Sequence, residues 1–252
     1  MPLDDHQLAR DLAVRTMAML VARRDELARQ GLAPPDWGPI GDREADDLIL
    51  GELRAARPDD AILSEESADD LRRLDERRVW VIDPLDGTRE FTSPGRTDWA
   101  VHVALTVDGA PDAAAVALPG GQVWSTAGPP PTGDGANDGH ALRMVVSRSR
   151  APQLAYDVAV ELGAEVVPWG SAGAKAAAVL AGDAELYLHA GGMRQWDSCA
   201  PAGVALALGF HASRIDGSAL RYNGRDVNLP DLLICRADLA QGALAAIERV
   251  AS

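Results

Sequence analysis

Residues 80–88 read Trp80-Val81-Ile82-Asp83-Pro84-Leu85-Asp86-Gly87-Thr88, an apolar run that ends in two carboxylates and a turn. Pro84 has a restricted φ and disfavours a helix at Asp83, and Gly87 permits a tight turn. Such a turn can direct both carboxylates and the Leu85 carbonyl at one small volume, and then open a helix whose N-terminus suits an anion. The same residues also fit an ordinary strand-to-turn transition, because Asp-Pro and Asp-Gly are common turn signals. This stretch alone leaves a cation site and a plain turn both open.

Two further acidic groups lie where apolar runs meet polar sequence. Glu65-Glu66 follows Ile62-Leu63-Ser64, and Trp196-Asp197 precedes an apolar helical pattern. Proteins of the α/β class bind ligands where strands end beside the starts of helices. Carboxylates gathered at such a place repel one another unless a hard cation binds them, and oxygen ligands suit Mg²⁺. The sequence therefore favours a magnesium site built from distant segments.

Composition restricts the classes of partner. The chain has 252 residues, with 38 acidic and 24 basic side chains and a formal net charge of -14. This balance argues against nucleic acid, which proteins bind through clustered Lys and Arg. Two cysteines are too few for a disulfide framework, and no secretory, lipidation or membrane-spanning pattern is present. We therefore expect a soluble cytoplasmic protein with neither nucleic acid nor membrane as a partner.

Apolar periodicity predicts the order of the elements. A helix is expected up to Gln30-Gly31, and a second is expected to start after Asp42 and to end before Pro58. Strand-rich spacing then predicts an antiparallel-leaning sheet from segments 61–63, 79–82, 99–105, 113–118 and 122–126. Strands expected at 142–147, 165–168, 184–188 and 232–235 alternate with helices expected at 152–162, 172–180, 197–208 and 239–250. This alternation indicates the α/β class.

A stretch rich in Gly and Pro divides the chain. Residues 128–139 read GPPPTGDGANDG, a composition typical of a surface loop. We take it as a connecting loop between two subdomains. Residues 1–127 are expected to form an N-terminal α+β metal-binding subdomain, and residues 140–252 a C-terminal α/β substrate-binding subdomain.

The acidic groups together resemble a known superfamily. Glu65-Glu66, residues 83–88 and Trp196-Asp197 occur in the order and approximate spacing of the inositol monophosphatase superfamily, whose members are lithium-sensitive, Mg²⁺-dependent phosphatases. Asp42 lies upstream where that superfamily keeps an aspartate, although Pro39-Ile40-Gly41 replaces the Val-Thr of many relatives. The resemblance covers most of the chain. It implies a layered αβαβα sandwich of the inositol monophosphatase and fructose-1,6-bisphosphatase type.

The resemblance also implies roles for individual residues. Two Mg²⁺ ions, and in some relatives a third, would be held by five oxygen donors: Glu65, Asp83, Leu85 (through its carbonyl), Asp86 and Asp197. Asp83 would bridge the first two ions, and Li⁺ would inhibit by occupying a magnesium position. Thr88 and Asp42 would orient and deprotonate the attacking water, and with Glu65 they make up the predicted catalytic set.

Several segments resemble one branch of this superfamily, the CysQ type, which dephosphorylates 3′-phosphoadenosine 5′-phosphate. Lys175 is the single lysine of the chain and lies in Gly170-Ser171-Ala172-Gly173-Ala174-Lys175. By itself it is more simply interpreted as a surface lysine, but Val146-Ser147-Arg148-Ser149 and Trp196-Asp197-Ser198 also match the branch. The resemblance implies these substrate contacts: Gly87, Thr88, Ser147, Arg148, Ser149, Ser171, Lys175 and Asp197. Ser147, Arg148, Ser149 and Lys175 would lie nearest the 5′-phosphate.

The expected activity is Mg²⁺-dependent hydrolysis of the 3′-phosphate of 3′-phosphoadenosine 5′-phosphate, giving AMP and phosphate. Activity on inositol phosphates or on fructose 1,6-bisphosphate is the alternative, because the metal ligands do not select the alcohol. A two-carboxylate glycosidase and an inactive metal- or nucleotide-binding protein are the other hypotheses. The sequence contains no Walker A or Gly-x-Ser-x-Gly motif, and we interpret His102 as structural. A small-molecule phosphate ester is the expected partner, and the chain is expected to be a monomer or a homodimer.

Overall fold

The computed structural model describes residues 3–128 and 141–251. Within this part of the chain, seven α-helices and two five-stranded sheets are present. None of the described helices combines the length and the apolar character needed to cross a membrane. The predicted connecting loop at 128–139 lies outside the described residues except for Gly128.

Helix α1 (Asp5–Arg29) has the boundaries that its end signals predict. The Asp4 side chain accepts a hydrogen bond from the Gln7 backbone N–H at 2.7 Å and so caps the N-terminus. The helix ends before Gly31, whose φ of +76° favours glycine. The predicted first helix is confirmed.

Helix α2 (Trp37–Ala56) begins earlier than predicted. A short 3₁₀ turn, η1 (Pro34–Asp36), leads directly into it. The expectation that the helix starts after Asp42 is therefore wrong. Pro39 is tolerated because it lies in the first turn, where backbone N–H groups have no acceptor within the helix. As a result Asp42 lies inside the helix, one turn before Asp46 on the same side.

The first sheet contains the five strands expected from the first half of the sequence, in the order β1-β2-β3-β4-β5. Only the β1–β2 pair is parallel, so the sheet leans antiparallel as predicted. The strands are β1 (Ala61–Ser64), β2 (Arg78–Asp86), β3 (Ala100–Val107), β4 (Ala110–Ala117) and β5 (Val123–Ser125). The 3₁₀ turn η2 (Leu71–Asp75) precedes β2, and helix α3 (Thr88–Phe91) follows it.

The second sheet has the order β7-β6-β8-β10-β9, with β6 parallel to both of its neighbours and β10 antiparallel to both of its own. Its strands are β6 (Arg143–Ser147), β7 (Glu165–Trp169), β8 (Leu186–Arg194), β9 (His211–Ser213) and β10 (Asn228–Cys235). The accompanying helices are α4 (Gln153–Leu162), α5 (Ala172–Ala181), α6 (Gln195–Ala207) and α7 (Ala240–Ala251), with the 3₁₀ turn η3 (Ala237–Leu239) before the last. The predicted alternation is confirmed; the short β9 was not predicted.

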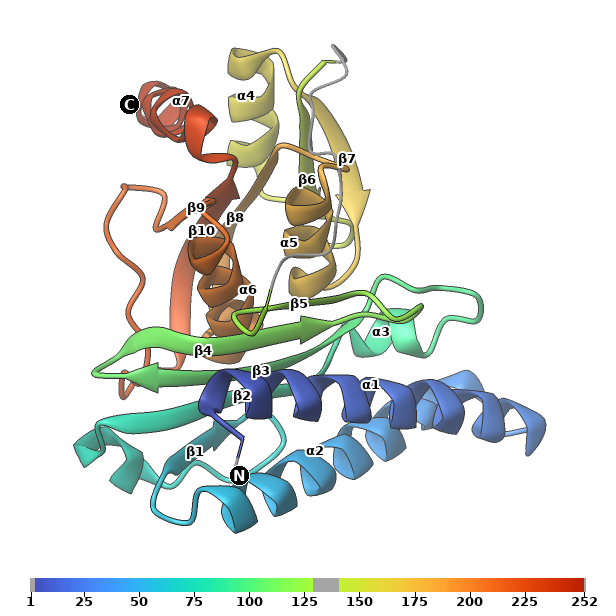
Figure 1. The fold of residues 1–252 in the computed structure, drawn as a ribbon. Helices are drawn as coiled ribbons and strands as arrows, with labels where there is room; N and C mark the ends of the chain where they lie inside the picture. The colour runs from blue at the N-terminus through green and yellow to red at the C-terminus, as the bar shows by residue number, and fades with distance from the viewer. Residues whose placement is uncertain (1–2, 129–140, 252) are drawn as a thin grey trace.

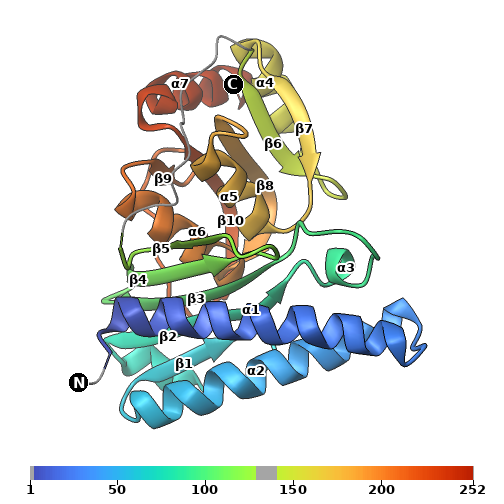
Figure 2. The same cartoon turned by 45° about the vertical axis from the view of Figure 1, so that its right-hand side comes forward.

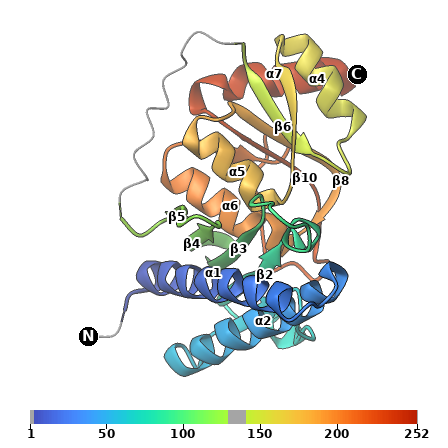
Figure 3. The same ribbon diagram turned by 90° about the vertical axis from the view of Figure 1, so that its right-hand side faces the viewer.

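The elements stack in five layers. Helices α1 and α2 cover one face of the first sheet, α5 and α6 lie between the two sheets, and α4 and α7 cover the far face of the second sheet (Figures 1, 2 and 3). Each interface between helices and a sheet has an apolar interior, and the largest cluster surrounds α5 and α6. The order helix, sheet, helix, sheet, helix confirms the expected αβαβα sandwich.

Candidate active site

Strand β2 continues through Asp83 to Asp86 instead of ending at Ile82. Its pairing with β3 is irregular between Asp83 and Asp86, where Pro84 cannot donate to the ladder. The Leu85 backbone N–H instead donates to Asp83 Oδ1 at 3.1 Å. Gly87 then adopts φ +90° and turns the chain into α3. This local irregularity brings two carboxylates and the Leu85 carbonyl to the end of one strand.

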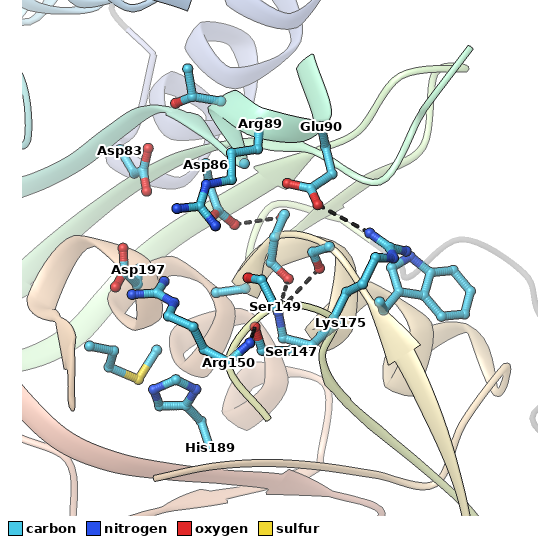
Figure 4. Close-up of a pocket in the computed structure, with 18 of the residues that line it drawn as sticks. Asp83, Asp86, Arg89, Glu90, Ser147, Ser149, Arg150, Lys175, His189 and Asp197 are labelled. Atoms are coloured by element: carbon cyan, nitrogen blue, oxygen red, sulfur yellow. Dashed lines mark hydrogen bonds and ion pairs between the residues drawn. The ribbon is translucent and has the colours of Figure 1, made fainter. Parts of the chain in front are cut away.

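A cavity of about 350 Å³ lies where this turn meets the end of β6 and the starts of α5 and α6 (Figure 4). It brings together all five predicted metal ligands: Glu65, Asp83, Leu85, Asp86 and Asp197. The remaining predicted substrate contacts line the same cavity: Gly87, Thr88, Ser147, Arg148, Ser149, Ser171 and Lys175. Segments far apart in the sequence therefore meet at one place.

The carboxylates of this cavity affect one another strongly. Burial raises the pKa of Asp83 well above its usual range, and the charges of Asp86, Glu65 and Asp197 add to this effect. Burial and neighbouring carboxylates also raise the pKa of Glu65 to about 7, and burial with the charge of Asp86 raises the pKa of Asp197 to about 6. Such mutual repulsion indicates an acidic cluster that lacks enough compensating positive charge in the protein itself.

Asp86 is the exception, because hydrogen-bond donors and positive charge surround it. Its Oδ2 accepts from Ser171 Oγ at 2.6 Å and from the Gly173 backbone N–H at 2.7 Å, and His102 Nε2 lies 3.3 Å away. Burial alone would raise the pKa of Asp86, but His102, Lys175 and Ser171 lower it to about 2. An added Cβ at Gly173 would lie 2.1 Å from His102 Nε2, so only glycine fits at this contact.

The donor chemistry fits Mg²⁺ when carbonyl and water oxygens are included. In the described part of the chain, no three or more His, Cys, Asp or Glu side chains are placed to hold a metal ion by themselves. Mg²⁺, however, is usually held by one or two carboxylates and keeps several waters. Asp86 and Asp197 each use Oδ2 in protein hydrogen bonds, and Oδ1 of each accepts no hydrogen bond from residues 3–128 or 141–251. These oxygens, with the Leu85 carbonyl, could serve as ligands.

Asp42 is the one predicted site residue that does not line this cavity. It borders a neighbouring hollow with Glu66, and its Oδ1 lies 3.5 Å from Thr88 Oγ1. Thr88 Oγ1 is also 3.3 Å from the Leu85 carbonyl oxygen. Burial, Glu66 and Glu65 raise the pKa of Asp42 to about 7, which suits a proton acceptor near neutral pH. Asp42 thus reaches the cavity through Thr88.

Helix α2 approaches helix α3 closely because two of its glycines face the Thr88–Phe91 segment. An added Cβ at Gly38 would lie 2.7 Å from the Thr88 methyl carbon, and one at Gly41 would lie 3.0 Å from the Phe91 ring. Within the Pro39-Ile40-Gly41 segment, Gly41 therefore permits close packing against Phe91.

Lys175 lies in the cavity wall, but its ammonium group already has protein partners. It is 4% exposed and donates to the carbonyl oxygens of Gly170, at 3.1 Å, and of Ser171. Its Nζ also lies 5.1 Å from the centre of the Tyr187 ring. Burial lowers the pKa of Lys175 to about 8. In this arrangement Lys175 holds the Gly170-Ser171 turn at the start of α5.

Arg148 also has partners in the wall. Its guanidinium donates to Glu90 at 3.1 Å and to Asp98 at 2.8 Å. Two arginines that the sequence analysis did not single out, Arg89 and Arg150, line the same cavity (Figure 4). The available signal was their position, directly after Thr88 and directly after Ser149.

Similarity to known proteins extends over most of the chain. Residues 36–251 match the inositol monophosphatase family. The chain is 50% identical over 263 aligned positions to a 3′-phosphoadenosine 5′-phosphate phosphatase of Mycobacterium leprae, covering 98% of this chain and 95% of the relative. It is 53% identical over 225 positions to the Mycobacterium bovis protein of the same name, covering 85% and 83%.

Solved structures show the same fold. The crystal structure of CysQ from Bacteroides thetaiotaomicron, described as a bacterial member of the inositol monophosphatase family, superposes with a TM-score of 0.73 at 23% identity, covering 92% of this chain and 97% of that one. An inositol monophosphatase from Anabaena superposes with a TM-score of 0.72 at 18% identity, covering 97% and 95%. The family match over residues 36–251 and the relatives that are 50% and 53% identical show that the chain belongs to the inositol monophosphatase family.

Proposed function

We propose that this protein is a phosphatase that hydrolyses the 3′-phosphate of 3′-phosphoadenosine 5′-phosphate, with AMP and phosphate as products. The observation that carries the proposal is 50% identity, over 98% of this chain, to a Mycobacterium leprae protein with that named activity. The cavity supports it, because the oxygen donors implied for the metals and the side chains implied for the substrate line one space. The same cavity argues against a glycosidase, which needs two carboxylates and no cation.

Two Mg²⁺ ions, with a third in some states, are the proposed cofactors. By the resemblance, Glu65, Asp83 and the Leu85 carbonyl would hold the first, and Asp83, Asp86 and Asp197 the second. Side chains of the second set would have to close on the ion as it binds, because no three such side chains among residues 3–128 and 141–251 already surround one ion position. The raised pKa values of Glu65, Asp83 and Asp197 support this assignment, because bound cations would favour the charged carboxylates against the burial and the mutual repulsion that raise these values. Bound Mg²⁺ would neutralise charge on the transferring phosphoryl group and acidify the attacking water.

The chain's own residues would then position the reactants and move one proton. Thr88 Oγ1 lies between Asp42 and the Leu85 carbonyl, so it can orient a water toward the phosphorus. Asp42, with a pKa of about 7, can take up the proton that the water loses as it attacks. Ser171 and Gly173 hold Asp86 in place by donating to its Oδ2. Catalysis by such a site is mainly positioning and charge neutralisation.

A phosphate-release panel tests the proposal. The purified protein is assayed with 3′-phosphoadenosine 5′-phosphate, inositol 1-phosphate and fructose 1,6-bisphosphate, each with Mg²⁺ and with EDTA. We expect the highest kcat/KM for the adenosine bisphosphate, no release in EDTA and inhibition by millimolar Li⁺. A preference for either sugar substrate would refute the substrate assignment, and release in EDTA would refute the metal assignment.

The proposal extends to organisation and setting. The first 127 residues supply four of the five proposed metal ligands, so we propose them as the metal-binding subdomain and residues 140–252 as the substrate-binding subdomain. A small phosphorylated molecule is the partner that the cavity favours. We propose that the protein acts in the cytoplasm as a monomer or homodimer, which gel filtration with light scattering can test.

A further inference from the structure

Arg89 and Arg150 stand out among the cations of the cavity. Within residues 3–128 and 141–251, neither guanidinium group has a hydrogen-bond or ion-pair partner. Arg148 is instead paired with Glu90 and Asp98, and Lys175 donates to two carbonyl oxygens. Of the four cationic side chains that line the cavity, two are therefore occupied and two are available to a ligand.

Local backbone geometry separates the available arginines from the paired residues beside them. After β6, Ser147 Oγ accepts a hydrogen bond from the Arg150 backbone N–H at 3.2 Å, which closes a tight turn. Arg148 within that turn reaches out to Glu90, while the Arg150 side chain extends toward Asp197 (Figure 4). On the facing wall, Glu90 reaches to Arg148 while Arg89 extends over the cavity beside Asp86 (Figure 4).

We infer that Arg89 and Arg150 together bind the second phosphate of a bisphosphate substrate, the one that is not transferred, and make the enzyme selective for bisphosphates over monophosphates. The inference rests on the function proposed above. The transferred phosphate would meet metal ions held by the carboxylates, but the second phosphate needs cations from the chain itself. A guanidinium fork forms two hydrogen bonds with phosphate oxygens, and such charge-assisted bonds are strong.

This assignment replaces the prediction that Arg148 and Lys175 lie nearest that phosphate. To bind it, Arg148 would have to leave Glu90 and Asp98, and Lys175 would have to leave the carbonyl oxygens of Gly170 and Ser171. Moving Arg148 would break both of its ion pairs, and moving Lys175 would break two hydrogen bonds of a buried ammonium group. Both changes cost stability. Arg89 and Arg150 are exposed at the cavity mouth and break no such bonds when a phosphate binds.

The test compares two substrates that differ by one phosphate. The kcat/KM values for 3′-phosphoadenosine 5′-phosphate and for adenosine 3′-monophosphate are measured with the wild-type protein, Arg89→Ala, Arg150→Ala and Arg225→Ala. Arg225 is exposed and lies outside the cavity lining, so its variant loses the same charge elsewhere. Thermal unfolding of each variant confirms that it is folded.

We expect each of the two cavity variants to lose about 10- to 100-fold in kcat/KM for the bisphosphate, the range for hydrogen bonds to charged groups. Their activity on the monophosphate should change less than about threefold, and Arg150→Lys should restore part of the selectivity, because Lys keeps the charge without the fork. Equal losses on both substrates, or no loss on either, would overturn the inference. So would an Arg148→Ala variant that loses selectivity as strongly as Arg150→Ala. If the wild-type protein did not hydrolyse the bisphosphate at all, the proposed function itself would fail.

Discussion

Ser171 links backbone strain to the proposed metal site, and its substitution gives a sharp prediction. Its hydroxyl donates to Asp86 Oδ2 at 2.6 Å and accepts from the Ala174 backbone N–H at 2.9 Å, which caps helix α5. Its backbone has φ +39° and ψ 148°, a conformation that residues with a Cβ rarely adopt. One side chain thus stabilises two features while its backbone is strained.

Replacing Ser171 by Ala and by Gly separates these contributions. Both variants lose the hydrogen bond to a charged carboxylate, about 1.5–3 kcal/mol, and the alanine variant also loses about 1 kcal/mol of helix capping, where glycine loses about a few tenths. We therefore expect Ser171→Ala to lower the free energy of unfolding by about 3 kcal/mol. Ser171→Gly loses the same hydroxyl but relieves the φ strain, worth about 1–3 kcal/mol. After the entropy cost of glycine it should be about 1 kcal/mol more stable than the alanine variant.

Thermal unfolding in EDTA measures both effects. For a chain of this size, 1 kcal/mol corresponds to about 2–4 °C in Tm. Ser171→Ala should melt about 6–12 °C below the wild-type protein, and Ser171→Gly about 2–4 °C above Ser171→Ala. An alanine variant within 2 °C of the wild type would refute the role of the hydroxyl. A glycine variant no more stable than the alanine variant would refute the argument from strain.

Three further predictions concern the acidic cluster. Asp83→Asn should lower kcat by about 10³-fold or more, because several kcal/mol of stabilisation by the metal ions is lost. Mg²⁺ should also no longer raise the Tm of this variant. A Tm increase equal to that of the wild-type protein would contradict the bridging role of Asp83. The Tm increase on adding Mg²⁺ should be larger at pH 8 than at pH 5.5, because the raised pKa of Glu65, about 7, and that of Asp83 favour the protonated groups at low pH. A carboxyl group whose pKa is raised by folding lowers the free energy of unfolding as the pH rises from about 4 toward 7, and bound Mg²⁺ offsets this loss. A Tm increase that does not depend on pH would contradict this prediction. Asp46→Ala should raise the Mg²⁺ concentration needed for half-maximal activity severalfold. The Asp46 carboxylate accepts hydrogen bonds from Ser64 Oγ at 2.5 Å and from Ser67 Oγ at 2.6 Å, and so it holds the segment that carries Glu65. An unchanged Mg²⁺ titration would show that this segment keeps its position without Asp46.

Much of the fold follows from local sequence. The apolar periods of the helices, the strand alternation, and end signals such as Asp4 and Gly31 depend on neighbours along the chain, so they can be recognised before the structure is known. The turn at residues 83–88 is equally local: Pro84 and Gly87 shape it wherever the rest of the chain lies. Misplaced boundaries occurred where tertiary packing extended an element, as at the start of α2 and at the end of β2.

The sequence by itself predicted the order and class of the elements, because periodicity depends on residues that are close along the chain. The layered sandwich and the proposed oxygen donors were implied only by the resemblance to a known superfamily. Only the tertiary structure decided which charges are available. Arg148 and Arg150 are two residues apart and chemically identical, yet Glu90 and Asp98 pair with the first and not with the second. Whether a cation is paired depends on groups brought close by folding from distant parts of the chain, because Coulomb energy depends on distance in space and not along the sequence.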